Sequence, residues 1–242
     1  MKPPYETQSD VDGMLASAKD AIVTVGGARG FLVQGLGVRV VTAAHCLPHL
    51  PPAHPMSFTE ERTYEKLVGS LEAPAGVWAE CLFVDPIADV AVLGQSSLSE
   101  ECEAFGQFME GRPTLRVAAV TDSCAGWLLT LDGRWDACTV RRARGTHTLT
   151  LVDAQVRPGM SGSPILTHTG HVIGVVSVGG ASNGAEDREQ HGQPALIRVL
   201  PSWFLTELQI PMRLIATQRR ADGEWRQSLR TFSRGAEKKG GA

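Results

Sequence analysis

The sequence predicts an all-β protein built from two small barrels, and three observations support this prediction. The chain of 242 residues is 43% hydrophobic, which is enough apolar material for one large core or two smaller ones. Its 26 glycines and 14 prolines exceed average usage, as expected for many short strands joined by tight turns. Strand-like runs also recur along the whole chain, at residues 21–25, 30–33, 38–42, 77–84, 90–93, 115–120, 127–131, 148–156, 164–166, 172–178 and 195–199.

The elements that flank these runs are a weak helix, a loop and a closing helix. Residues 10–19 have weak helical character, and glycine turns separate the three strands that follow them. The proline-rich segment from His49 to Pro55 excludes a helix interior or a central strand, so it predicts an irregular loop. Apolar residues at helical spacing after Pro201 predict a helix over 201–210 that closes the domain.

Residues 213–242 differ in charge from the rest of the chain. They hold eight Lys or Arg against three acidic residues, although the whole chain has a net charge of −3. Trp225, Leu229 and Phe232 share one helical face, so a docking helix, a linker and a solvated basic tail all fit this segment. Nucleic acid is not expected as a partner, because the arginines of the segment belong to no recognised motif or stacking platform.

The cysteines and the hydropathy pattern predict a cytoplasmic protein with reduced thiols. Five cysteines is an odd number and no pair has C-x-x-C spacing, which favours free thiols over a disulfide framework. No run approaches the roughly 18 apolar residues of a membrane helix, and the first ten residues lack the pattern of a secretion signal. No membrane partner is therefore expected.

Three short segments contain residue types used in nucleophilic catalysis, namely T-A-A-H-C ending at Cys46, D-P-I-A-D-V-A-V-L ending at Leu93, and P-G-M-S-G-S-P ending at Pro164. A serine hydroxyl is a weak nucleophile at neutral pH, so it needs an imidazole to accept its proton and a carboxylate to orient the imidazole. His45, Asp89 and Ser161 supply these groups. Gly159 lets the backbone turn, so that the N–H groups of Gly159 and Ser161 converge on a developing oxyanion.

In that order, these segments resemble the chymotrypsin-fold serine proteases, in particular the bacterial branch with HtrA-like and V8 glutamyl-endopeptidase-like members. Asp89 follows His45 by 44 residues and Ser161 follows Asp89 by 72, and the resemblance covers about residues 20–212. It implies two six-stranded antiparallel barrels, over roughly 20–110 and 111–200, with the histidine and aspartate in the first and the serine in the second. It also implies a trypsin-like serine endopeptidase domain over 1–212 that hydrolyses protein or peptide substrates without a cofactor or metal.

The resemblance assigns supporting residues as well. Ser177 matches the serine that supports the catalytic aspartate, and Ser177, Val178 and Gly179 match the segment that pairs with an extended substrate strand. Gln155 and Val156 match the wall of the primary specificity pocket. Because these pocket residues are uncharged, we expect cleavage after a small or medium apolar residue.

Two residues depart from the family pattern. Met160 stands where digestive enzymes have an aspartate that pairs with a newly cut N-terminus, so activation by trimming is not expected. Cys46 lacks its usual partner upstream, which predicts an unpaired buried thiol. A cytoplasmic protease must be restrained in another way, so we expect a regulatory protein or attached domain, with residues 213–242 as its docking segment.

The same residues also admit other functions. The alternative of a different class is a latent or catalytically silent chymotrypsin-like module that binds an extended peptide or a partner. An α/β-hydrolase would need the order Ser, acid, His and a G-x-S-x-G turn, with Asp187 and His191 completing its triad. Cys46 directly follows the histidine, which does not suit a nucleophile. Interleaved prolines oppose the remaining candidate, a zinc site made of His45, Cys46, His49 and His54.

Overall fold

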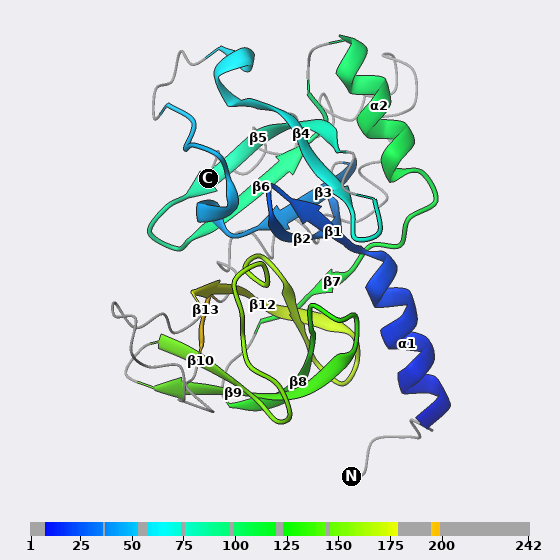
Figure 1. Cartoon of the computed structure of the whole chain (residues 1–242), viewed down its shortest axis with the longest axis vertical. Helices are drawn as coiled ribbons and strands as arrows, with labels where there is room; N and C mark the ends of the chain where they lie inside the picture. Colours follow the sequence, from blue (N-terminus) through cyan, green and yellow to red (C-terminus); the bar gives the residue numbers. More distant parts are fainter. Residues whose placement is uncertain are drawn as a thin grey trace, which may run out of the picture.

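The strands of the protein form two groups that follow one another along the chain, and each group wraps into a barrel. The computed structural model describes residues 8–35, 37–52, 58–73, 76–96, 99–119, 123–143, 146–178 and 195–198. Figure 1 shows the first barrel above the second. This is the all-β, chymotrypsin-like double barrel that the sequence predicts. Within the described residues, no helix is long and apolar enough to cross a membrane.

The first barrel closes in the strand order β1-β2-β3-β6-β5-β4, and every neighbouring pair is antiparallel. Its core is rich in valine, leucine and alanine, and both Phe31 and Leu32 of β2 are fully buried on opposite faces of the strand. The strands are β1 Ile22–Val25, β2 Ala28–Gly35, β3 Gly37–Thr42, β4 Thr63–Ser70, β5 Val77–Asp85 and β6 Val90–Gly94.

Strand β4 has no counterpart among the strand-like runs of the sequence. Lys66 in its middle has a left-handed φ of 47°, and the register with β5 shifts between Tyr64 and Val68. An irregularity of this kind interrupts the alternation of apolar and polar residues that identifies a strand. Pairing with β1 and β5 therefore defines this strand better than its own pattern does.

The second barrel contains β8 to β13, with β7 added at one edge. Antiparallel pairings join β11-β8-β9-β10-β13-β12, and a further pairing of β11 with β12 closes the ring. Strand β7 pairs in parallel with the start of β12. The strands are β7 Arg116–Val117, β8 Cys124–Leu129, β9 Trp135–Ala143, β10 Thr146–Leu151, β11 Pro164–Leu166, β12 His171–Val178 and β13 Ala195–Arg198.

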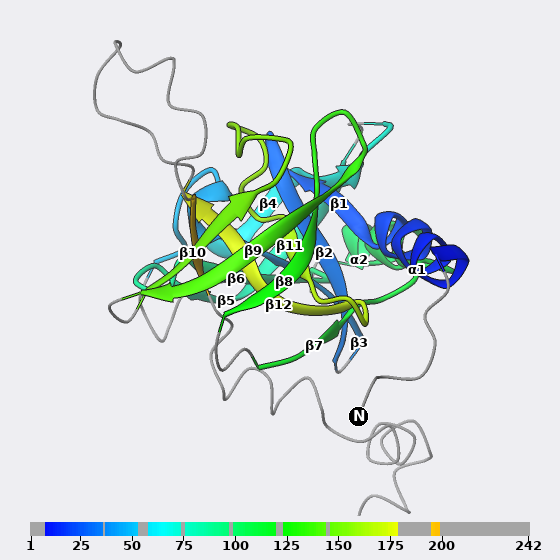
Figure 2. The same ribbon diagram turned by 90° about the horizontal axis from the view of Figure 1, so that it is seen from below.

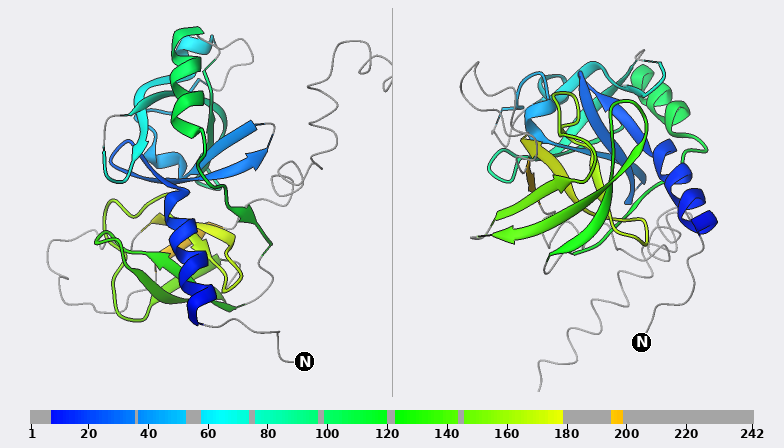
Figure 3. Two further views of the ribbon diagram at one scale, coloured as in Figure 1. Left: turned by 90° about the vertical axis from the view of Figure 1, so that its right-hand side faces the viewer. Right: turned by 60° about the horizontal axis from the view of Figure 1, so that its bottom comes forward.

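Two α-helices lie on the same side of the molecule, as the left view of Figure 3 shows. Helix α1, Gln8–Asp20, reaches the second barrel, because the Trp135 indole N–H donates to the Leu15 carbonyl at 3.0 Å. Helix α2, Ser99–Met109, packs against β5 and was not predicted from the sequence. The predicted helix over 201–210 and the basic segment 213–242 lie outside the described residues.

The boundary between the barrels is bridged by main-chain hydrogen bonds. The Leu115 N–H donates to the Leu32 carbonyl, and the Arg29 N–H donates to the Ser161 carbonyl, both at 2.8 Å. In Figure 2 the second barrel faces the viewer, with α1 at one side of it. All three residues predicted as a catalytic triad come from segments at this boundary.

Candidate active site

His45 lies in a short 3-10 turn that follows β3. This turn, η1 Ala44–Cys46, is closed by hydrogen bonds from the Cys46 N–H to the Ala43 carbonyl and from the Leu47 N–H to the Ala44 carbonyl. The His45 side chain is 45% exposed, so its ring is accessible to a substrate.

Asp89 is presented by a tight turn between β5 and β6. The Asp85 carboxylate accepts hydrogen bonds from the backbone N–H groups of Ile87 and Ala88, each at 2.9 Å, as in an Asx turn. Asp89 has a left-handed φ of 51°, a region in which Asp and Asn are enriched. The D-P-x-x-D motif therefore fixes the backbone that presents the second aspartate.

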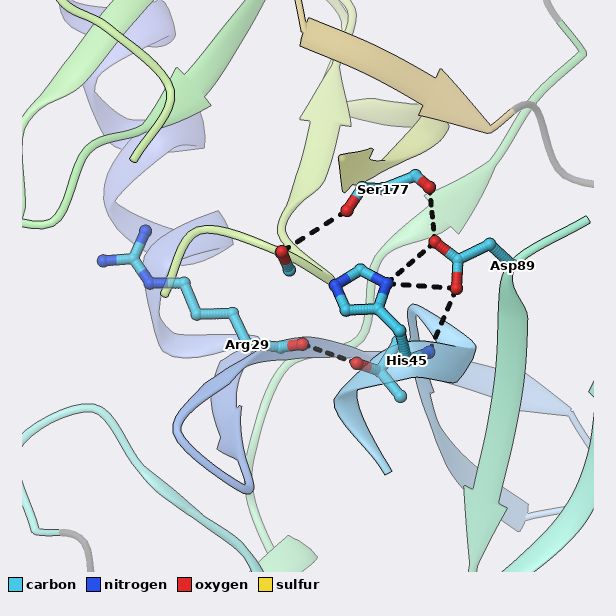
Figure 4. Close-up of polar contacts among 6 residues, drawn as sticks. Arg29, His45, Asp89 and Ser177 are labelled. Carbon is cyan, nitrogen blue, oxygen red and sulfur yellow. Dashed lines mark hydrogen bonds and ion pairs between the residues drawn. The ribbon is translucent and has the colours of Figure 1, made fainter. Parts of the chain in front are cut away.

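The buried carboxylate of Asp89 contacts both barrels (Figure 4). Nδ1 of His45 lies 2.9 Å from Oδ2 and 3.1 Å from Oδ1, and the His45 backbone N–H donates to Oδ1 at 3.0 Å. From the second barrel, the Ser177 hydroxyl donates to Oδ2. An ionised carboxylate only accepts hydrogen bonds, so this contact favours the tautomer with its proton on Nδ1. Nε2 of His45 is then left as a proton acceptor.

Ser161 lies in the second barrel, in the loop before β11. Its hydroxyl donates to the Ser177 carbonyl at 3.4 Å rather than to the His45 ring. Contacts between nucleophile and base are often long in substrate-free sites.

The 157–160 turn precedes Ser161 and has type II geometry. The Met160 N–H donates to the Arg157 carbonyl at 3.1 Å, Pro158 takes the second position, and Gly159 takes the third with a φ of 92°. Proline favours the second position, and the left-handed φ at the third favours glycine. Within the described residues, the N–H groups of Gly159 and Ser161 make no hydrogen bond. Two donors next to Ser161 are thus available for an incoming oxygen.

The predicted substrate-binding residues are described only in part. Val156 packs against the core of the second barrel, whereas Gln155 is exposed on the loop before the 157–160 turn. Ser177 and Val178 form the end of β12. Gly179 lies outside the described residues, so the substrate-binding segment and the pocket wall stay predictions.

The cysteines and the residues of the alternative zinc and hydrolase sites are the remaining candidates. All five cysteines are free, as the sequence predicts. Burial raises the pKa of Cys46 to about 11, so this thiol is protonated at neutral pH and unsuited to nucleophilic attack. No group of three His, Cys, Asp or Glu side chains in the described part of the chain is placed to hold a metal ion. Other candidates lie outside the described residues, namely His54, Asp187 and His191.

Two residues beside the site were given no role by the sequence analysis. The Thr42 hydroxyl donates to the Arg29 carbonyl at 2.7 Å, and the Arg29 guanidinium donates to the carbonyls of Leu129 and Thr130 at 2.5 and 2.9 Å. Arg29 is the one charged residue of β2, and its side chain is buried. A charge in an otherwise uncharged strand is the signal that could have drawn attention to it.

Comparisons with known proteins agree with the fold. Residues 28–175 match the model of the trypsin-like peptidase domain, a span of more than half the chain that includes His45, Asp89 and Ser161. No curated protein matches the chain.

Similar solved structures are bacterial proteases of low sequence identity. The active form of the Rv3671c protease from M. tuberculosis is 18% identical with a TM-score of 0.47, over 86% of this chain and 92% of that chain. The MamO protease domain from Magnetospirillum magneticum is 16% identical with a TM-score of 0.44, over 78% and 96%. A serine endoprotease from Yersinia pestis is 15% identical with a TM-score of 0.48, over 88% and 70%.

Proposed function

The chain belongs to the trypsin-like peptidase domain family, and from that premise we propose that it is a serine endopeptidase acting through His45, Asp89 and Ser161. The observation that carries this proposal is the Asp89 carboxylate, which accepts hydrogen bonds from His45 Nδ1 and from Ser177 across the barrel boundary. A carboxylate held in this way orients the imidazole and stabilises its protonated form.

In the proposed reaction, Oγ of Ser161 attacks the carbonyl carbon of a peptide bond while Nε2 of His45 takes the hydroxyl proton. The carbonyl oxygen becomes an oxyanion, which accepts hydrogen bonds from the N–H groups of Gly159 and Ser161. His45 then returns the proton to the leaving amine, and an acyl-enzyme remains on Ser161. Water, deprotonated by His45, hydrolyses the ester and restores the serine.

Contacts at the end of β12 support binding of an extended peptide. The Ser177 carbonyl accepts the Ser161 hydroxyl in the free protein, and a backbone N–H of the substrate would replace that weak contact. Exchange of partners in this manner would free the Ser161 hydroxyl to turn toward His45. Substrate binding and alignment of the nucleophile are thus coupled in the proposed mechanism.

Further parts of the proposal concern specificity, regulation and location. We propose a small or medium apolar residue before the scissile bond, with Gln155, Val156 and Ser177 to Gly179 contributing to the pocket and the substrate strand. A regulatory protein or domain is proposed to act through residues 213–242, and the compartment is proposed to be the bacterial cytoplasm.

Reaction with a fluorophosphonate probe tests the proposed function. Intact-mass analysis should show one adduct on the wild-type chain and none on Ser161→Ala, because the reaction needs an activated serine and oxyanion donors. A folded wild-type chain that forms no adduct would refute the proposal for the isolated chain. That outcome would favour the alternative of a latent or silent module that binds an extended peptide.

A further inference from the structure

We propose that Arg29 is a positioning residue that holds the 157–160 turn and the nucleophile loop in place, an inference that rests on the proposed role of Ser161. Arg29 lies in β2 of the first barrel and is 6% exposed. Its guanidinium reaches the second barrel and donates to the carbonyls of Leu129 and Thr130, at the end of β8. Figure 4 shows its side chain directed away from His45 and Asp89, so it acts on neither directly.

Among the described residues, the charge of Arg29 has no carboxylate partner. Ion pairs in the described part of the chain join His45 to Asp89, Arg62 to Glu80 and Arg134 to Asp132, and none includes Arg29. Burial lowers the pKa of its guanidinium, because the charged form has lost its hydration. A cation buried without an opposite charge is costly, and an apolar side chain of similar length would fill the space more cheaply. The two carbonyl contacts are therefore the feature that requires an explanation.

The main chain of Arg29 contacts the nucleophile loop on two sides. Its N–H donates to the Ser161 carbonyl at 2.8 Å. Its carbonyl, which accepts the Thr42 hydroxyl at 2.7 Å, lies only 1.8 Å from the position that a Cβ on Gly162 would occupy. This close packing leaves the Ser161–Gly162 backbone little room to shift relative to β2.

The side chain of Arg29 extends this support to the 157–160 turn. A Cβ on Gly159 would lie 3.6 Å from the Gly27 carbonyl oxygen and 3.7 Å from Cδ2 of Leu131, so the turn is flanked by these two groups. Gly27 precedes Arg29 by two residues. Leu131 directly follows the two residues whose carbonyls the guanidinium holds. Arg29 thus connects both flanks of the turn, one through the main chain that leads into β2 and one through its side chain.

This arrangement predicts an effect on the oxyanion donors without an effect on the proton-transfer pair. Residues 130–134 form a turn after β8, in which the Thr130 N–H donates to the Arg134 carbonyl at 2.8 Å and the Gly133 N–H to the Thr130 carbonyl at 3.1 Å. Loss of the guanidinium would loosen the attachment of this turn to β2, and with it the Leu131 flank of the 157–160 turn. The Gly159 N–H would then be less well fixed relative to Ser161. Small displacements of such groups slow the chemical step while leaving ground-state substrate binding intact.

Hydrogen–deuterium exchange tests the inference without relying on activity. In the Ser161→Ala background, Arg29→Met should speed exchange of peptides that contain the Met160 and Ser163 amides by about tenfold or more, while β4 and β5 keep their rates. Arg29→Lys keeps the charge but not the two-pronged geometry, so an intermediate increase is expected. Arg141→Met is the matched control, because this arginine is exposed on β9 and lies outside the 130–134 turn.

The same variants in the active chain give a second measurement. The rate of fluorophosphonate labelling per folded molecule should fall about 10- to 100-fold in Arg29→Met, with peptide affinity in the Ser161→Ala background unchanged. Unchanged exchange at the 157–160 turn, or acceleration spread evenly over both barrels, would overturn the inference. An unlabelled wild type would count against the proposed function alone, because the exchange measurement still decides the role of Arg29.

Truncation of Leu131 keeps the inference testable if Arg29→Met does not fold. This side chain is 46% exposed, so Leu131→Ala leaves the core intact. If Arg29 acts through the 130–134 turn, Leu131→Ala must also speed exchange at the 157–160 turn. Exchange at the wild-type rate in this variant would contradict the proposed route.

Discussion

Replacement of Asp89 by asparagine tests the contact on which the proposed mechanism depends. The side chain keeps its size, and asparagine tolerates the left-handed φ of 51° at this position as well as aspartate does. What changes is the hydrogen-bonding capacity, because the buried carboxylate accepts from His45 Nδ1, from the His45 N–H and from Ser177. An amide offers one acceptor oxygen and one donor nitrogen in place of two acceptors.

Both orientations of the amide impair the site. If its oxygen stays beside the His45 backbone N–H, its NH₂ group faces Nδ1, and the ring must carry its proton on Nε2, where it cannot take one from Ser161. If the amide is reversed, the His45 backbone N–H loses its acceptor, at about 1–3 kcal/mol. Only the reversed amide leaves Nε2 free to accept a proton, so its cost of about 1–3 kcal/mol lowers the acylation rate by at least about 5- to 150-fold. A neutral amide also stabilises the protonated imidazole less than a carboxylate does, which brings the loss in acylation rate toward about 10⁴-fold.

The second-order rate of fluorophosphonate labelling, followed by intact mass at pH 7, is the appropriate assay. Asp89→Asn should label at least about fivefold more slowly than wild type, and Ser161→Ala should not label at all. Circular dichroism should show that all three proteins are folded. Labelling of a folded Asp89→Asn variant at the wild-type rate would refute the assigned role of Asp89.

Three further predictions concern stability. Gly162→Ala should lower the free energy of unfolding in urea by about 3 kcal/mol or more, because its Cβ would meet the Arg29 carbonyl. The control is Gly111→Ala, at a position with a similar φ but open space around it, which should lower the free energy of unfolding by only about 1–2 kcal/mol. Equal losses would argue against the clash. Burial lowers the pKa of His147, so near pH 6.5 the unfolded chain binds more protons than the folded chain. The free energy of unfolding should therefore fall as the pH drops through about 6.5. Urea titrations at several pH values should show a weaker pH dependence for His147→Leu. The buried Ser163 hydroxyl has no hydrogen-bond partner among the described residues. Ser163→Ala should therefore raise the free energy of unfolding in urea by about 1 kcal/mol. A lower free energy of unfolding would reveal a missing partner.

The segments of the predicted triad could be recognised in the sequence because each is shaped by neighbouring residues. Asp85 closes the turn that presents Asp89, and Pro158 with Gly159 forms the turn before Ser161. Information of this kind is contained in a few consecutive residues. Segment order and spacing then supplied the two-barrel architecture through the family resemblance.

Elements whose form depends on distant partners were not recognised. Strand β4 is interrupted at Lys66, and β9 turns the buried Asp136 inward, where it accepts the Asp153 N–H. Neither strand shows a clean alternation of polar and apolar residues. Arg29 makes its contacts across 100 and 101 residues of sequence, so no local pattern could indicate its partners.

The distribution of the site over two barrels explains why these long-range contacts matter for the proposed chemistry. The first barrel supplies His45 and Asp89, already paired, whereas the second supplies Ser161 and the 157–160 turn. Correct alignment therefore depends on the few contacts across the boundary, chiefly Ser177 with Asp89 and Arg29 with Ser161. Because a displacement of about 1 Å can cost a hundredfold in rate, a partner that shifts one barrel against the other would switch the proposed activity without touching the triad. The proposed regulation through residues 213–242 would then require only a change in barrel alignment.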